Sequence, residues 1–178
     1  TPDSIAIGDI NDDSKLDLVV SNADSNNVSV LNGNGAGGFA TAVAYATGAV
    51  PRGVTLADFN ADNKLDIATA NFNGNSVSVL LNNGLGAFVA AATSTVGTTP
   101  IALLSGDFNN DLKADLVVVN YGSSNLSFLA GAGNGTFAAA ANTGVGGLPY
   151  AVAAADVNAD GKLDAIVANS GGNSISVL

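Results

Sequence analysis

The sequence predicts an all-β fold, a β-propeller-type array of four-stranded antiparallel blades. A single unit recurs every 49 residues, and each copy opens near a proline, at Pro2, Pro51, Pro100 and Pro149. Glu, Gln and Met, which favour helices, are absent, whereas Val, Ile, Thr and Phe alternate with frequent Gly and Asn. This composition favours short strands that are joined by tight turns.

Each repeat contains four stretches that predict strands. In the second repeat the first two, GVTLAD and LDIATAN, flank an acidic loop, and the third reads VSVL. The fourth is rich in Ala and Thr and follows a G-x-G-x-F turn. Four consecutive strands predict an antiparallel meander, and a meander that is apolar on both faces must stack on copies of itself, as in a propeller. A parallel β-helix is the main alternative, although its coils usually repeat at about half this period or less.

Small residues recur near the end of the first strand, which suits an innermost strand where blades crowd together. They are Gly8, Ala57, Gly106 and Ala155. The G-x-G-x-F turn places another recurring residue at Phe39, Phe88 and Phe137, and we expect these side chains to form core between blades.

We expect residues 1–178 to form one repeat array. Its repeats are 1–49, 50–98, 99–147 and 148–178, and the last lacks its fourth strand. A self-contained closed ring is therefore not expected. The chain could be a fragment, pair with a second copy to form a larger ring, or stack end to end through an open edge. Because it starts at Thr1 without Met or a visible signal peptide, we expect a piece of a longer polypeptide.

The charge of the chain is concentrated in four loops. The net charge is −10; 12 of the 15 Asp residues lie at the first, fifth and ninth positions of these loops, and four of the five basic residues lie at the seventh. No basic patch is available for phosphates, so we do not expect nucleic acid as a partner. No run of about 18 apolar residues is present, so we expect no membrane span.

The four loops read D-x-N-x-D-x-K-x-D and begin at Asp9, Asp58, Asp107 and Asp156. Side-chain oxygens at positions one, three, five and nine, with a carbonyl at seven, form the all-oxygen ligand set that Ca²⁺ prefers. A solvated turn is the ordinary explanation of one such loop, but four copies that hold nearly all the charge favour a metal. An EF-hand is excluded because position twelve is never acidic. Four Ca²⁺ ions would change the net charge from −10 to −2.

Strand, acidic loop, strand and G-x-G-x-F together resemble the FG-GAP repeats of integrin α-subunit propellers. They are more similar still to the FG-GAP-like, or VCBS, repeats of secreted bacterial proteins. The resemblance covers essentially the whole chain and implies up to four Ca²⁺ ions.

The implied ligands of the first loop are Asp9, Asn11, Asp13 and Asp17, with the carbonyl of Lys15. Those of the second are Asp58, Asn60, Asp62 and Asp66, with Lys64. Those of the third are Asp107, Asn109, Asp111 and Asp115, with Lys113. Those of the fourth are Asp156, Asn158, Asp160 and Asp164, with Lys162.

The sequence departs from this family at the sixth loop position, where glycine is usual. Only Gly161 obeys; the other loops have Ser14, Asn63 and Leu112. Leu tolerates a left-handed conformation poorly. We therefore expect the third loop to bind calcium most weakly, unless its backbone avoids positive φ there.

We expect a calcium-stabilised extracellular structural or adhesive module that contacts other protein chains or copies of itself. An enzyme is not expected, because the chain lacks His, Cys and Glu. The alternative is a carbohydrate-binding, lectin-like propeller, in which Tyr45, Phe72, Tyr121 and Tyr150 would stack on glycans. An extracellular location follows from the weak affinity that is common for calcium loops outside the cell.

Overall fold

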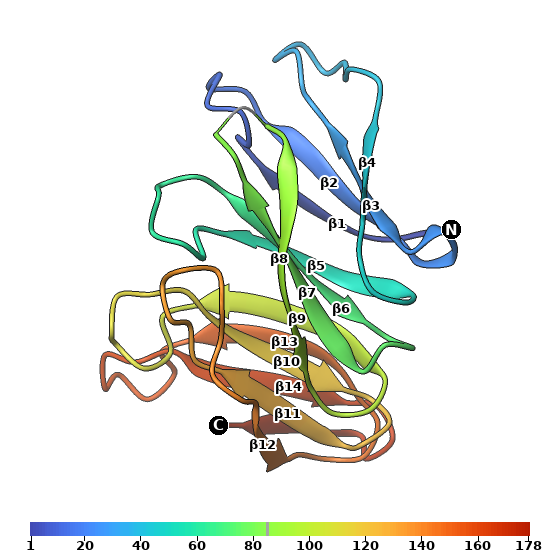
Figure 1. Cartoon of the computed structure of the whole chain (residues 1–178). Helices are drawn as coiled ribbons and strands as arrows, with labels where there is room; N and C mark the ends of the chain where they lie inside the picture. Colours follow the sequence, from blue (N-terminus) through green and yellow to red (C-terminus); the bar gives the residue numbers. More distant parts are fainter. Residues whose placement is uncertain (85) are drawn as a thin grey trace.

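The four repeats form four antiparallel sheets arranged as the blades of a propeller (Figure 1). The structure is a computed structural model that describes residues 1–84 and 86–178. Among these residues, three blades have four strands and the last has three. The all-β propeller fold that the sequence predicts is therefore confirmed, and so is the short last blade.

Each blade is a meander in which consecutive strands are hydrogen-bonded neighbours. Blade 1 contains β1 (Pro2–Gly8), β2 (Asp17–Asn22), β3 (Asn27–Leu31) and β4 (Val43–Ala46), with a 3-10 turn η1 (Ala23–Ser25) after β2. Blade 2 contains β5 (Pro51–Ala57), β6 (Asp66–Asn71), β7 (Ser76–Asn82) and β8 (Phe88–Thr95). Blade 3 contains β9 (Pro100–Gly106), β10 (Asp115–Asn120), β11 (Asn125–Leu129) and β12 (Ala141–Gly144). Blade 4 contains β13 (Pro149–Ala155), β14 (Asp164–Asn169) and β15 (Ser174–Val177).

The first strands of the blades lie next to one another, in the order β1, β5, β9 and β13. Small residues make this close approach possible. A Cβ atom built on Gly8 would lie 2.6 Å from Cδ1 of Leu65 in blade 2, and one on Gly106 would lie 2.9 Å from Leu163 in blade 4. The first strand is therefore the crowded inner strand, as the sequence predicts.

Three clusters of apolar side chains fill the spaces between blades. Val28 and Val30 of blade 1 pack with Val54 and Phe88 of blade 2. The second cluster joins blades 2 and 3, and the third joins blades 3 and 4. Because β6 and β10 face a cluster on both sides, every residue of these two strands is buried.

Asparagine at the end of each second strand holds the blade together. The Nδ2 group of Asn71 donates to the hydroxyls of Ser76 and Ser78, at 3.1 and 2.9 Å. Asn22, Asn120 and Asn169 make equivalent bonds to their own third strands. These amides stabilise the hairpin between the second and third strands, because each donates to a hydroxyl of the blade in place of water.

The recurring phenylalanines differ in burial. Phe88 is buried and Phe137 packs on Phe59 at a ring-centroid distance of 5.6 Å, which confirms their expected core role. For Phe39 the expectation is wrong, because 46% of its surface is exposed. Phe39 lies on the side of blade 1 that has no neighbouring blade in the structure, so no loop residue covers it.

Candidate metal centres

The four acidic loops connect the first and second strands of their blades, as the sequence predicts. Each loop turns sharply through two left-handed residues, at positions four and six. In the third loop these are Asn110 and Leu112, with φ of 60° and 66°. Leu112 does not avoid positive φ, and its side chain is 94% exposed. The third loop therefore has the positive φ on which the expectation of weak calcium binding depends. That it binds calcium most weakly stays a prediction.

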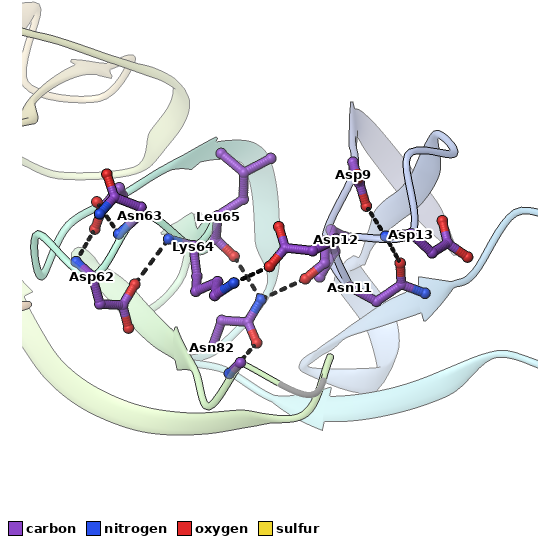
Figure 2. Close-up of polar contacts among 12 residues, drawn as sticks. Asp9, Asn11, Asp12, Asp13, Asp62, Asn63, Lys64, Leu65 and Asn82 are labelled. Carbon is purple, nitrogen blue, oxygen red and sulfur yellow. Dashed lines mark hydrogen bonds and ion pairs between the residues drawn. The ribbon is translucent and has the colours of Figure 1, made fainter.

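The first three ligand positions of each loop are gathered by the loop backbone. In the first loop the N–H of Asp13 donates to Oδ1 of both Asp9 and Asn11, at 3.1 Å in each case (Figure 2). Oδ2 of Asp9 accepts the N–H of Ser14, and Oδ1 of Asp13 accepts that of Lys15. The other three loops repeat this shared donor. The oxygens at positions one and three thus lie side by side in every loop.

The ninth position has a different environment from the other three. Asp17 is fully buried, and it accepts the N–H of Ile10 at 2.9 Å and that of Gly33 at 2.7 Å. Asp66 and Asp115 are fully buried as well. Each accepts the N–H of the second loop residue and a second N–H at or just after the end of the third strand, from Asn82 and Gly131 respectively. This aspartate therefore fastens the loop to the blade, a structural role that the motif alone does not reveal.

The carboxylates of one loop are not drawn together into a closed cage. Within residues 1–84 and 86–178, no three acidic, His or Cys side chains form a group that could hold a metal ion. The donor set nevertheless suits a hard cation, because each loop offers only oxygens and a carboxylate oxygen that accepts one N–H keeps a second lone pair.

Electrostatics in the second loop also favour a cation. The pKa of Asp66 is raised to about 6: burial is the main cause, the nearby carboxylates of Asp62 and Asp58 contribute to the rise, and two backbone hydrogen bonds oppose it. A positive ion among these groups would offset their mutual repulsion.

Lysine at the seventh position balances part of the acidic charge. Lys15 Nζ lies 2.9 Å from Oδ2 of Asp13, and this hydrogen bond lowers the pKa of Asp13. In the third loop, Lys113 Nζ lies 3.7 Å from Oδ2 of Asp111. Each of these lysines thus pairs with the fifth loop residue while its carbonyl remains part of the predicted ligand set.

Lys64 instead links two blades. Its ammonium pairs with Asp12 of the first loop, which raises the pKa of Lys64 (Figure 2). Beside this pair, Nδ2 of Asn82 donates to the carbonyls of Ile10 in blade 1, at 2.7 Å, and Leu65 in blade 2, at 3.2 Å. Sequence reasoning missed Asn82, although it interrupts a repeat position that has Gly33 and Gly131 in the neighbouring blades.

The aromatic residues considered for glycan stacking do not form a repeated set. Tyr45 packs edge-on against Phe88 at a ring-centroid distance of 5.2 Å and is partly buried. The guanidinium of Arg52 lies 4.1 Å from the centre of the Phe72 ring. Tyr121 is partly buried, and among these four only Tyr150 is exposed.

The sequence belongs to the FG-GAP-like repeat family. The family model matches residues 9–69, 58–118 and 107–167, so successive matches together cover most of the chain. The class of protein is thus an FG-GAP-like repeat propeller. No curated protein sequence matches this chain significantly.

Solved structures share the fold at low sequence identity. BBS1N in complex with ARL6DN has a TM-score of 0.68 at 15% identity, over 98% of this chain and 56% of that one. Streptogramin B lyase has a TM-score of 0.59 at 16% identity, with coverage of 98% and 53%. The V. cholerae biofilm matrix protein Bap1 has a TM-score of 0.60 at 18% identity, with coverage of 98% and 26%. The chain thus spans about half or less of the length of these proteins, and the likeness shows the fold alone.

No helix in the described part of the chain is long and apolar enough to cross a membrane.

Proposed function

We propose that this protein is a calcium-stabilised, non-enzymatic interaction module that works outside the cell. One observation carries the calcium assignment: in all four loops the oxygens at positions one and three share a single N–H donor and so lie side by side. Each loop would bind one Ca²⁺ through the side chains at positions one, three, five and nine and the carbonyl at seven. The ion would supply positive charge where the loop concentrates negative charge.

Calcium in this position would stabilise the blades. Each loop joins the inner strand of its blade to the second strand, so an ion that fixes the loop also fixes the two strands that carry most of the buried residues. In the second loop the ion would also favour the ionised form of Asp66, whose pKa burial raises. The expected role of the metal is to stabilise the fold, with no part in a reaction.

Contact with other protein chains is the function that the fold supports best. BBS1N, which has a similar fold, forms a complex with another protein chain, ARL6DN. The lysines and aspartates of the loops pair with one another, so we assign them no catalytic role. An extracellular setting is supported by the weak calcium affinity common in extracellular loops, with Kd of about 10⁻⁴–10⁻³ M.

Thermal unfolding followed by circular dichroism tests the calcium assignment, in millimolar Ca²⁺, in Mg²⁺ and in EGTA. A ligand at about 100 times its Kd adds about 2.7 kcal/mol to the free energy of unfolding per site, so several sites should raise the midpoint strongly. The matched control replaces Asp9, Asp58, Asp107 and Asp156 together by Asn, which keeps the shape of each loop and removes one charge. A large rise with Ca²⁺ alone, lost in the control, supports the proposal. Equal midpoints in Ca²⁺ and EGTA would refute it.

A further inference from the structure

The residue at position four of an acidic loop differs between blades, and it lies beside the loop of the next blade. It is Asp12 in the first loop, Ala61 in the second and Asn110 in the third. Asp12 pairs with Lys64 of the second loop. We propose that Asp12 controls the cation affinity of the second loop, because it holds the Lys64 ammonium away from the ligand oxygens of that loop. This role rests on the proposed calcium binding by the loops.

In the first and third loops the lysine stays with its own loop. Lys15 Nζ lies 2.9 Å from Oδ2 of Asp13, and Lys113 Nζ lies 3.7 Å from Oδ2 of Asp111. The fifth loop residue is an expected calcium ligand, so the ammonium lies at an oxygen that the ion would use. A cation that takes this carboxylate must break the lysine pair or lie beside a like charge.

The lysine of the second loop does not occupy this place. Its ammonium pairs with Asp12 across the junction of blades 1 and 2 (Figure 2). Oδ2 of Asp62, the fifth residue of the second loop, accepts the neutral Nδ2 group of Asn60 at 3.0 Å. A cation that approaches Asp62 therefore displaces a neutral donor, and the Lys64–Asp12 pair stays intact.

The stem of Lys64 follows a different course from the stem of Lys15. A Cβ atom built on Gly35 would lie 3.2 Å from Cδ of Lys15, so this stem runs along the G-x-G-x-F turn of its own blade. A Cβ atom on the equivalent Gly84 would lie 3.8 Å from Cε of Lys64, the far end of the stem. Lys64 thus extends away from its own turn and toward Asp12.

A second side chain fixes the same junction. Nδ2 of Asn82 donates to the carbonyls of Ile10 and Leu65, at 2.7 and 3.2 Å. These carbonyls belong to the same two loops as the ion pair, so the bridge keeps the loops in register. The equivalent residue of blade 3 is Gly131, which has no side chain to make such a bridge. Two departures from the repeat therefore act on one contact between blades 1 and 2.

The junction of blades 2 and 3 shows the arrangement without an acidic residue at position four. A cavity of about 300 Å³ there is lined by Ala61 of the second loop and Lys113 of the third. Lys113 keeps its partner Asp111 in its own loop. Because the cavity gives an acidic side chain at position 61 room beside Lys113, the affinity of the third loop should respond to one substitution there.

Calcium titration followed by NMR of the backbone amides tests the role of Asp12, with CaCl₂ added to the metal-free 178-residue chain. In every loop the N–H of the sixth residue donates to Oδ2 of the first, so each loop has its own reporter, namely Ser14, Asn63, Leu112 and Gly161. Asp12→Asn should weaken binding by the second loop about fivefold, the scale on which an exposed ion pair changes an equilibrium. Asp24→Asn is the matched control: it removes the same charge from the same blade outside the acidic loops, and the Asn63 titration should not change.

Loss of a negative charge near the loop also lowers calcium affinity directly, and Lys64→Gln separates this effect. In about 0.15 M salt the direct effect is largely screened. Asp12→Asn in the Lys64→Gln background should therefore weaken the second loop less than about twofold, because no ammonium remains to return to Asp62. Ala61→Asp is the converse variant: it should strengthen the third loop about fivefold, and Lys113→Gln should remove this gain.

The outcomes separate this role from the calcium assignment. If the loop amides respond to Ca²⁺ but the Asn63 midpoint is the same in wild type and Asp12→Asn, the role of Asp12 is overturned and the calcium assignment stands. The same conclusion follows if Asp12→Asn weakens the second loop equally with and without Lys64→Gln. If no loop amide responds to millimolar Ca²⁺, the proposed calcium binding fails and the role of Asp12 fails with it.

Discussion

Replacement of Asp115 by Ala should destabilise the protein in EGTA, where no metal contributes. The Asp115 side chain is fully buried, and its carboxylate accepts the N–H of Phe108 at 3.0 Å and that of Gly131 at 2.8 Å. Ala would leave both donors without an acceptor. Since a buried donor without a partner costs about 1–3 kcal/mol, the free energy of unfolding should fall by about 2–6 kcal/mol.

Urea unfolding at pH 7 in EGTA measures this loss. Asp107→Ala is the control from the same loop, because Asp107 is partly exposed and its donors, the N–H groups of Asp111 and Leu112, are accessible to water. Its loss should stay near 0.5 kcal/mol, the usual size for surface substitutions. Asp115→Asn keeps one carbonyl acceptor, so its loss should lie between those of the two Ala variants.

The contrast separates a structural acceptor from a pure metal ligand. If Asp115→Ala and Asp107→Ala lose the same free energy of unfolding in EGTA, the two backbone hydrogen bonds contribute little and the reasoning is refuted. If the difference appears only in Ca²⁺, Asp115 acts through the ion instead.

The remaining predictions concern the loop backbone and the pH. Leu112→Gly should raise the free energy of unfolding by about 0.5–1 kcal/mol. Removal of a left-handed Leu relieves about 1–2 kcal/mol of strain, and the greater conformational freedom of Gly in the unfolded state cancels about 0.5–1 kcal/mol of this gain. Leu112→Gly should also strengthen calcium binding by the third loop. Asn63→Gly should change the free energy of unfolding less. Equal increases for the two variants in urea unfolding would contradict the strain argument. In EGTA, Asp66 should contribute a stability that falls as the pH rises from about 4 to 6. The folded pKa is about 6 and lies above the ordinary value of 3.8, so the folded state holds the proton more tightly. Asp66→Asn should flatten this part of the pH profile, and an unchanged slope would show that Asp66 titrates normally.

Sequence reasoning predicted the parts of the fold that depend on local pattern. Turn residues and apolar stretches act over a short range, and they predict the 49-residue period and the strand boundaries near Pro51 and Asp66. The same holds for the acidic loops, because their spacing between two strands already defines a hairpin connection. The role of calcium stays a prediction, since it depends on the affinity of the loops for an ion.

Contacts between blades could not be predicted in this way. Asn82 bridges the carbonyls of Ile10 and Leu65, which lie 72 and 17 residues away, and no local pattern specifies such a partner. The buried position of Asp66 also depends on the N–H of Asn82 at the end of the third strand. Burial and hydrogen bonding there result from the packing of complete blades.

The sequence by itself determined the repeated blade and the acidic loop that each of the four repeats contains. Only the tertiary structure decided the environment of equivalent residues. Val28 and Ile175 occupy the same repeat position, yet one is buried and the other is 70% exposed. The physical reason is that burial depends on whether a neighbouring blade covers the face, and a repeat that is nearly identical in every copy carries no local signal of its place in the array.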